Sequence, residues 1–339
     1  MKRFGYRKSR TGCLRCKQRR VKSDTDSSCI SCVQLMHHYT ANAHRTLLTP
    51  CLHACAALQH AVPQEAFIYP ALLHQLLAFS ALHLAYIHPN TRQQYLIQAS
   101  QHQTTAIAGT RVLLAEPAAS DSCHALYASS IFVMISGFGI YPSWEKENAT
   151  FEPIGSLVDI FVLVGGMSVI LESSDTQLRQ GPLRGLFRDC ACPLPQVKDQ
   201  VHELVAKLAT LIPLFEETSE LDREERQTLV EVTALLIEIL EATKTSKRTL
   251  ATPELRAIIA WPARLSTAYL ALMRRHHPLA LVVLSFFCVL LNAREDNYWF
   301  LDGWAAILLK SIARIVVISP WKEMIRWPID TVGGVDLEA

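Results

Sequence analysis

Four cysteines close to the amino end have the types and spacing of a metal site. Cys13 and Cys16 form one CxxC pair, Cys29 and Cys32 form a second, and twelve residues separate the pairs. A CxxC turn lets two thiolates face one tetrahedral zinc ion, and a second turn completes four sulfurs. Few apolar residues surround them, so burial cannot order this segment and a metal is needed. We therefore predict zinc as the cofactor, in preference to incidental cysteines in a disordered basic tail.

The charge of this segment predicts its partner. Residues 1–22 contain ten basic residues and no acidic one, whereas the rest of the chain has 23 basic against 31 acidic residues. The formal net charge of the whole chain is only +2. Such asymmetry points to a polyanion that binds the basic segment alone, and no amphipathic apolar stripe favours a membrane there. We expect double-stranded DNA as the partner.

The order of residues in this segment matches a known module. Residues 8–22, KSRTGCLRCKQRRVK, followed by Asp24, resemble the first half of the fungal zinc binuclear cluster, a DNA-binding module in which six cysteines hold two zinc ions. The resemblance implies that Cys13 and Cys29 bridge two ions and that Cys16 and Cys32 are terminal ligands.

Two of the six ligand positions lack a thiol. The third cysteine of the family falls on Ser23 and the sixth falls near Tyr39. Two arrangements are possible. The four remaining thiolates hold one zinc ion, or they hold two ions that each lack one sulfur ligand. His37 or His38 could replace the sixth ligand, but we favour their placement in the first helix of the following domain.

The resemblance also implies how the module reads DNA. In the family, basic residues of the short helix after the second cysteine contact a CGG triplet in the major groove, and the matching positions are Arg19 and Arg20, with Lys22 just beyond. Arginine can donate two parallel hydrogen bonds to guanine. Residues expected to contact phosphates are Arg7, Lys8, Arg10, Arg15 and Lys17. A nuclear-import signal over residues 17–22 is the alternative, and either role predicts the nucleus.

The remainder of the chain is rich in leucine and alanine with helical periodicity. Apolar residues recur at helical spacing over 72–84, 93–115, 123–140, 157–171, 197–215, 221–243, 264–275, 278–292 and 299–317, and no long alternating stretch favours strands. Thr252-Pro253 and Ser319-Pro320 each offer a helix start. We predict an all-α protein, with a small zinc-stabilised DNA-binding module at 1–34 and a large helical regulatory domain of nine or ten helices at 35–339.

Several stretches of this domain resemble one group of fungal regulators. They are residues 35–40 (LMHHYT), 69–85, 299–304 (WFLDGW) and 321–329 (WKEMIRWPI), and they resemble the regulatory domain of zinc-cluster activators of the sterol-uptake-control type. The resemblance implies a hydrophobic pocket for a sterol-like ligand. The family's linker and sixth cysteine are missing between Cys32 and Leu35, and without sustained heptads dimerisation is unsupported.

Together these features predict a sequence-specific nuclear regulator of RNA polymerase II transcription, acting on sterol metabolism or a secondary-metabolite gene cluster, with the transcription machinery as a partner. The alternative is a helical lipid-binding or protein-interaction module that no longer binds DNA and acts by sequestration. An enzyme is not expected, because the helical part carries no nucleophile elbow, acid pair or cofactor fingerprint. Neither a secretory signal nor a membrane segment is expected, since the longest apolar run, residues 279–291, is too short to cross a bilayer.

Overall fold

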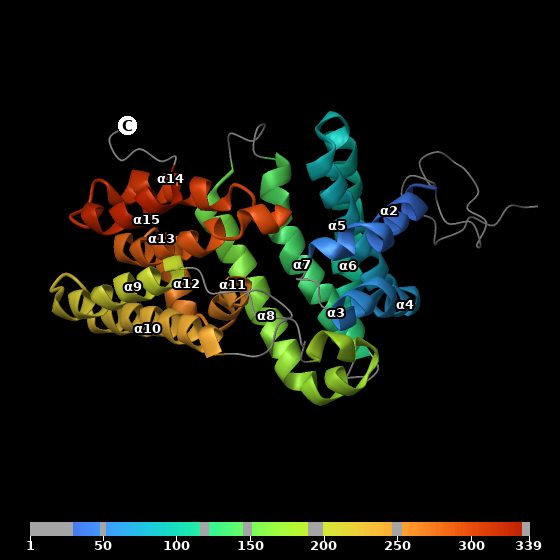
Figure 1. Cartoon of the computed structure of the whole chain (residues 1–339), viewed down its shortest axis with the longest axis horizontal. Coiled ribbons are helices and arrows are strands. Elements are labelled where there is room, and N and C mark those ends of the chain that lie inside the picture. The colour runs from blue at the N-terminus through green and yellow to red at the C-terminus, as the bar shows by residue number, and fades with distance from the viewer. Residues whose placement is uncertain are drawn as a thin grey trace, which may run out of the picture.

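A computed structural model describes residues 30–47, 52–115, 122–144, 151–188, 199–245 and 253–333. Within these ranges the secondary structure consists of helices with no strand, which confirms the all-α prediction. The predicted zinc module at 1–34 lies outside the described residues except for its last five positions. Figure 1 shows two groups of helices, α2 to α6 on one side and α9 to α15 on the other, with α7 and α8 between them.

The first group of helices surrounds α5 (Pro70–Ile87). Its neighbours are α2 (Ile30–Ala41), α4 (Val62–Ile68), α6 (Arg92–Ala115) and α7 (Cys123–Trp144). Short helical segments connect them: η1 (Ala43–Thr46), α3 (Leu52–Ala56), the π-helical η2 (Ala57–Ala61) and η3 (Pro89–Thr91). Twelve of the eighteen residues of α5 are buried, because neighbours cover it on several sides.

The second group surrounds α13 (Pro278–Asn292), in which every residue from Leu279 to Leu291 is buried. It contains α9 (Asp199–Glu217), α10 (Arg223–Thr245), α11 (Pro253–Ala263), α12 (Thr267–Arg274), α14 (Trp304–Val316) and α15 (Arg326–Val332). The short helices η6 (Glu295–Asn297), η7 (Trp299–Leu301) and η8 (Lys322–Ile325) join the longer ones. The short helix η5 (Pro182–Phe187) follows α8 and contacts α3, α4 and η2 of the first group. Helix α8 (Pro153–Gln180) contacts α7 on one side and α11, α12 and α14 on the other, so it links the two groups.

Helix starts follow from capping chemistry. The Glu152 side chain accepts hydrogen bonds from the backbone N–H groups of Ile154 and Gly155, which satisfies two free donors at the start of α8. Asp222 and Glu225 form a reciprocal capping box before α10, with the Glu225 N–H donating to Asp222 Oδ1 over 2.8 Å. These caps help to fix the starts of α8 and α10.

The number and the boundaries of the helices differ from the sequence-based prediction. The described residues form more α-helices than the nine or ten expected, and α8 extends beyond the predicted run 157–171 at both ends. Two other differences have a local cause. The single helix expected over 299–317 is divided, because Gly303 adopts a left-handed conformation (φ 77°) between η7 and α14. The start signal at Ser319-Pro320 does not begin an α-helix directly. Instead the Ser319 hydroxyl accepts from the Trp321 N–H, the chain makes the short helix η8, and α15 begins only at Arg326.

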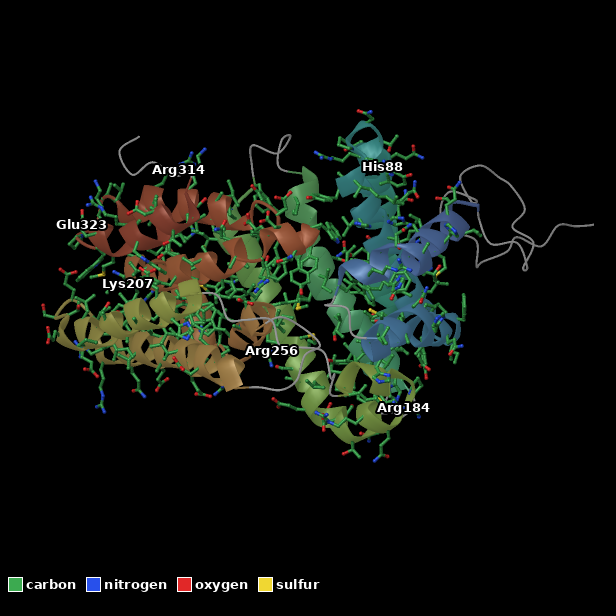
Figure 2. All side chains as sticks on the ribbon, in the orientation of Figure 1. His88, Arg184, Lys207, Arg256, Arg314 and Glu323 are labelled. Carbon is green, nitrogen blue, oxygen red and sulfur yellow. The ribbon has the colours of Figure 1, made fainter. Side chains whose placement is uncertain are left out.

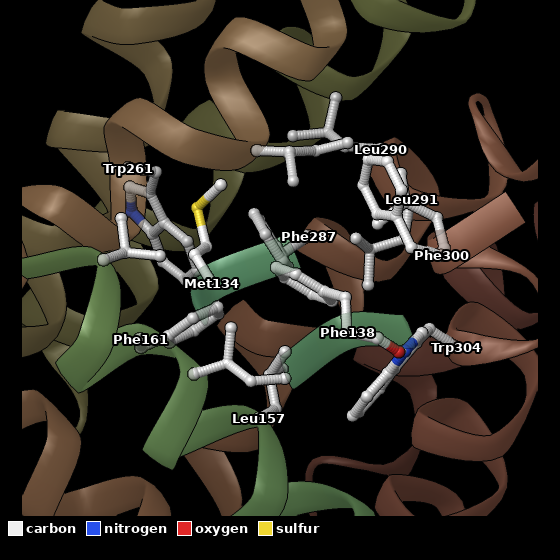
Figure 3. Packing of buried hydrophobic residues seen from close by; sticks show 14 of the residues in the cluster. Met134, Phe138, Leu157, Phe161, Trp261, Phe287, Leu290, Leu291, Phe300 and Trp304 are labelled. Carbon is white, nitrogen blue, oxygen red and sulfur yellow. The ribbon is translucent and has the colours of Figure 1, made fainter. Parts of the chain in front are cut away.

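The core is built from interlocking aromatic and aliphatic side chains. Figure 3 shows Phe161, Trp261 and Phe287 packed together between α8, α11 and α13. The Trp261 indole N–H donates to the Val232 carbonyl over 3.1 Å, so its one polar atom is satisfied inside the core. Cys123 and Cys288 are also buried, as expected for cysteines that fill the core.

The sequence-based expectation that no segment is long and apolar enough to cross a membrane is wrong. In the described ranges, four helical segments are long and apolar enough to cross a bilayer: Pro70–Ile87, Cys123–Pro142, Pro153–Gln180 and Pro278–Asn297. Single polar residues interrupt the apolar runs of these four helices, but the mean hydropathy of each helix stays high enough for a membrane-spanning segment. Most of the apolar window is buried in three of them, whereas in Pro153–Gln180 only 39% is buried.

Candidate functional site

The structure describes little of the predicted DNA-binding module. Of the four predicted zinc ligands, only Cys32 lies within the described residues; Cys13, Cys16 and Cys29 lie outside them. The predicted DNA contacts also lie outside the described residues: Arg7, Lys8, Arg10, Arg15, Lys17, Arg19, Arg20 and Lys22. The described part of the site is therefore the helix that follows directly after Cys29.

That helix, α2, is firmly attached to the helical domain. Its inward face carries Leu35 and Tyr39, which are 1% and 0% exposed, while Val33 on the opposite face is 48% exposed. The Tyr39 ring packs edge-on against Phe79 of α5, and its hydroxyl donates to the Leu58 carbonyl over 2.8 Å. Burial raises the pKa of Tyr39 well above its usual value, so the hydroxyl stays protonated and remains a donor.

A pair of histidines joins α2 to α5. His38 Nε2 lies 2.8 Å from His83 Nδ1 in a buried hydrogen bond, and the two rings stack with centroids 5.0 Å apart. Trp299 of η7 covers the other partner, with its ring centroid 5.2 Å from that of His83. Because one nitrogen must donate and the other accept, the pair is bonded when both rings are neutral.

These contacts decide which groups near the sixth ligand position could reach a metal. Tyr39 is enclosed in the core, and the Nε2 atom of His38 is engaged by His83. His37 lies on the exposed face of α2. The geometry supports the placement of His37 and His38 in the first helix of the domain, and it leaves neither Tyr39 nor His38 available as a surface ligand.

A second histidine pair connects α5 to α6. His74 Nδ1 lies 2.9 Å from His102 Nδ1, with ring centroids 5.1 Å apart. Burial and, to a smaller extent, the nearby His74 lower the pKa of His102 to about 4. Burial, together with His38 and His88, lowers the pKa of His83 to about 4. Both pairs are therefore neutral near pH 7. Sequence analysis missed them, because their members are 45 and 28 residues apart with no local signal.

The first turn of α2 is also held by a hydrogen bond. The Ser31 hydroxyl donates to Gln98 Oε1 of α6 over 2.7 Å. Next to it, Cys32 is half-buried and packs against the domain core. The turn that carries the fourth predicted zinc ligand is thus in contact with α6 and the core.

The described residues offer other side chains that could bind a metal or DNA, and the basic ones are distributed over several elements. No group of three or more histidine, cysteine or acidic side chains is arranged to hold a metal ion among the described residues. Figure 2 shows Arg184, Lys207, Arg256 and Arg314 projecting from four different elements.

The helical domain has a shallow pocket between α10 and α12. Its volume is about 180 Å³, and Asp222, Glu225 and Arg275 are among its lining residues. The Arg275 guanidinium donates to the Glu225 carboxylate across it. The small volume and charged lining do not suit a sterol, because ligand pockets usually have volumes of roughly 300 to 1,000 Å³ and mainly apolar walls.

The aromatic residues of the stretches 299–304 and 321–329 form contacts between helices. Trp299 and Trp304 are 7% and 1% exposed, and the Trp304 indole N–H donates to the Phe138 carbonyl over 2.8 Å. Trp327 is partly buried; it stacks on Phe286 and donates to Glu203. These residues pack helices together, as expected for interhelical core residues.

Comparison with known proteins gives two distant relatives. A Zn(2)-C6 fungal-type transcription factor of Gibberella zeae is 22% identical over 306 residues, which cover 88% of this chain and 61% of that protein. Sterol uptake control protein 2 of Saccharomyces cerevisiae is 22% identical over 285 residues, which cover 83% of this chain and 30% of that protein. The chain thus spans less than two thirds of either relative. No family model matches the chain.

Both relatives are named as regulators of a kind consistent with the predicted family. Their names support a role in transcription regulation rather than catalysis. The aligned share of this chain is too large to lie within the cysteine-containing segment alone, so the likeness extends through the helical domain.

Proposed function

We propose that this protein is a nuclear, sequence-specific regulator of RNA polymerase II transcription, in which a zinc-ordered basic segment binds DNA and the helical domain receives a ligand or a protein partner. The observation that carries the proposal is the coincidence of two features. The chain has paired CxxC motifs within a segment of ten basic residues, and its relatives over more than four fifths of its length are a zinc-cluster transcription factor and a sterol uptake control protein.

In this proposal four thiolates hold a single zinc ion. Ser23 replaces the family's third cysteine, and the residues near the sixth position, Tyr39 and His38, are engaged inside the helical domain. Cys13, Cys16, Cys29 and Cys32 still provide the four sulfurs that a tetrahedral structural zinc needs. When bound, the ion supplies folding free energy to the basic segment and performs no chemical step.

The proposal assigns two roles to the basic residues. Guanines are recognised by Arg19 and Arg20, and phosphates are contacted by Lys8, Arg10, Arg15 and Lys17. Arg20→Ala tests the first role, because losing one bidentate arginine contact removes about 1 to 3 kcal/mol of discrimination against the wrong base. Lys8→Ala is the matched control, since losing one phosphate contact weakens binding to all duplexes alike and reduces the salt dependence by about one ion.

The measurement is fluorescence anisotropy of the full chain with CGG-containing and scrambled duplexes at several salt concentrations. The proposal expects Arg20→Ala to bring the two affinities closer together and Lys8→Ala to lower both by a similar factor. If the wild-type chain binds both duplexes equally at physiological salt, sequence-specific recognition is refuted. If the two variants exchange their effects, the assignment of roles is refuted.

A sterol-like ligand of the helical domain is part of the same proposal. One relative is named for sterol uptake control, which supports testing a sterol first. Ergosterol is a suitable probe. Saturable binding to the full chain with a raised thermal unfolding temperature is expected, because a ligand that binds only the folded state stabilises it. No change at saturating ergosterol would refute this part alone.

A second candidate function rests on the incomplete cluster. Because two of six ligand positions lack a thiol, the chain could act as a helical interaction module that sequesters partners without binding DNA. Elemental analysis of the purified chain separates the two functions. Bound zinc favours the DNA-binding regulator, whereas its complete absence together with a folded helical domain favours sequestration.

A further inference from the structure

Helix α2 belongs to two functional units. It begins at Ile30, one residue after Cys29, and carries Cys32 in its first turn. The same helix continues to Ala41 and buries Leu35 and Tyr39 in the core of the helical domain. A helix is stiff over this length, so its two ends cannot move independently.

Three contacts from different elements fix α2 in place. At its start, Ser31 donates to Gln98 of α6 over 2.7 Å. In its second half, His38 is bonded to His83 of α5 over 2.8 Å, and Tyr39 donates to the Leu58 carbonyl of η2 over 2.8 Å. These contacts set both the rotation of α2 about its axis and its position along that axis.

The His38–His83 contact depends on its surroundings. Trp299 covers His83, and its indole N–H donates to Thr46, which lies just beyond α2 in the chain. Gly139 of α7 makes room for Trp299, because a Cβ atom at that position would lie 2.8 Å from the Trp299 ring. The position of α2 therefore depends on the packing of α5, α7 and η7.

We propose that α2 couples the zinc site to the helical domain: docking of the helix fixes the position of Cys32, so zinc affinity depends on contacts made inside the helical domain. This inference rests on the proposed function, since it takes Cys32 as a zinc ligand. The helical domain holds the DNA-binding segment through a shared helix, and a change in the packing of α5 or η7 alters metal binding and DNA binding together.

Thermodynamic linkage gives the coupling a second consequence. If docking of α2 strengthens zinc binding by some factor, zinc must strengthen docking of α2 by the same factor. Zinc is therefore expected to slow hydrogen exchange at backbone amides of residues 33–41, which lie beyond the cysteines. A flexible connection between the two units would confine the effect of zinc to the cysteine-containing segment.

The test compares zinc affinities of full-length variants by competition with a chromogenic chelator. His83→Leu removes the partner of His38, and Gln98→Leu removes the acceptor of Ser31 without touching the cysteines. Both variants are expected to lower zinc affinity by about fivefold or more, the lower limit of typical coupling between sites. Gln98→Leu lies on α6 and keeps the test valid if His83→Leu fails to fold.

His74→Leu is the matched control. It removes the α5 member of the other, partly buried histidine pair, which is bonded over 2.9 Å to His102 of α6 and does not include His38. Like His83→Leu, this variant is expected to lower the thermal stability of the domain. Its zinc affinity is expected to change by less than about twofold, which is smaller than the typical coupling between two binding sites.

The outcomes separate the inference from the proposed function. Weaker zinc binding in His83→Leu and Gln98→Leu, with His74→Leu close to wild type, supports the coupling. Equal zinc affinity in all four proteins, or tighter binding when α2 is loosened, overturns the coupling and leaves the proposed function standing. If the wild-type chain binds no zinc, the proposed function itself fails.

Discussion

The two histidine pairs, one buried and one partly buried, predict that the helical domain loses stability in mild acid. Burial and the neighbouring histidines lower the pKa of His83 from 6.5 to about 4, and burial with His74 lowers that of His102 from 6.5 to about 4. Each pKa unit corresponds to about 1.4 kcal/mol, so protonating either ring costs about 3 kcal/mol more in the folded protein than in the unfolded chain. The folded protein therefore disfavours protonation that the unfolded chain accepts.

The sign and the pH window follow from these values. Between pH 6.5 and about 4 the unfolded chain binds more protons than the folded one, so the free energy of unfolding falls as the pH is lowered. The stabilisation from the neutral rings is complete above pH 6.5, and these residues cause no further loss below pH 4. Each site contributes a slope of at most about 1.4 kcal/mol per pH unit.

Urea unfolding followed by far-ultraviolet circular dichroism at pH 7, 6 and 5 measures this effect. The double variant His83→Leu/His102→Leu removes both strongly shifted rings and is expected to be less stable at pH 7 but to lose less stability on acidification. The difference in unfolding free energy between pH 7 and 5 should shrink by about 2 to 4 kcal/mol. An unchanged pH dependence in the variant would refute the assignment of neutral buried pairs.

Two further predictions concern the packing of the domain. Glu254→Gln leaves the buried guanidinium of Arg294 without its ionic partner, so we expect a loss of about 3 to 5 kcal/mol in unfolding free energy, while Glu254→Leu/Arg294→Met should recover most of it. Gly139→Ala forces a methyl group against Trp299 and should cost about 1 to 2 kcal/mol, whereas Gly166→Ala, which meets open space, should stabilise by up to about 1 kcal/mol. Denaturant unfolding checks both; equal effects of the two glycine variants would contradict the packing argument.

Most of the helical architecture could be predicted from local signals. The apolar repeat over 221–243 corresponds to α10, and that over 278–292 matches the bounds of α13. Helix α10 has an amphipathic repeat and a capping box, and α13 is a continuous apolar run with Pro278 at its first position, so local preference and tertiary packing agree in both. The boundary near Gly303 was missed, because a left-handed glycine inside an apolar stretch gives no break in the periodicity.

The attachment of the predicted DNA-binding segment could not be predicted from the sequence. The contacts that hold α2 join residues 67 and 45 positions apart, Ser31 to Gln98 and His38 to His83. Histidine on a helix has no fixed partner in sequence, so periodicity could place His38 in a helix but could not find His83. The division between residues 34 and 35 remains a prediction, and α2 extends across it.

The central claim is that thiolate-bound zinc orders the basic segment so that it reads DNA. The most direct measurement is the zinc content of the purified full-length chain, combined with its affinity for CGG-containing and scrambled duplexes before and after chelation. The account predicts bound zinc and a preference for the CGG duplex that chelation abolishes and added zinc restores. A chain without zinc, or a preference that survives complete removal of the metal, would contradict it.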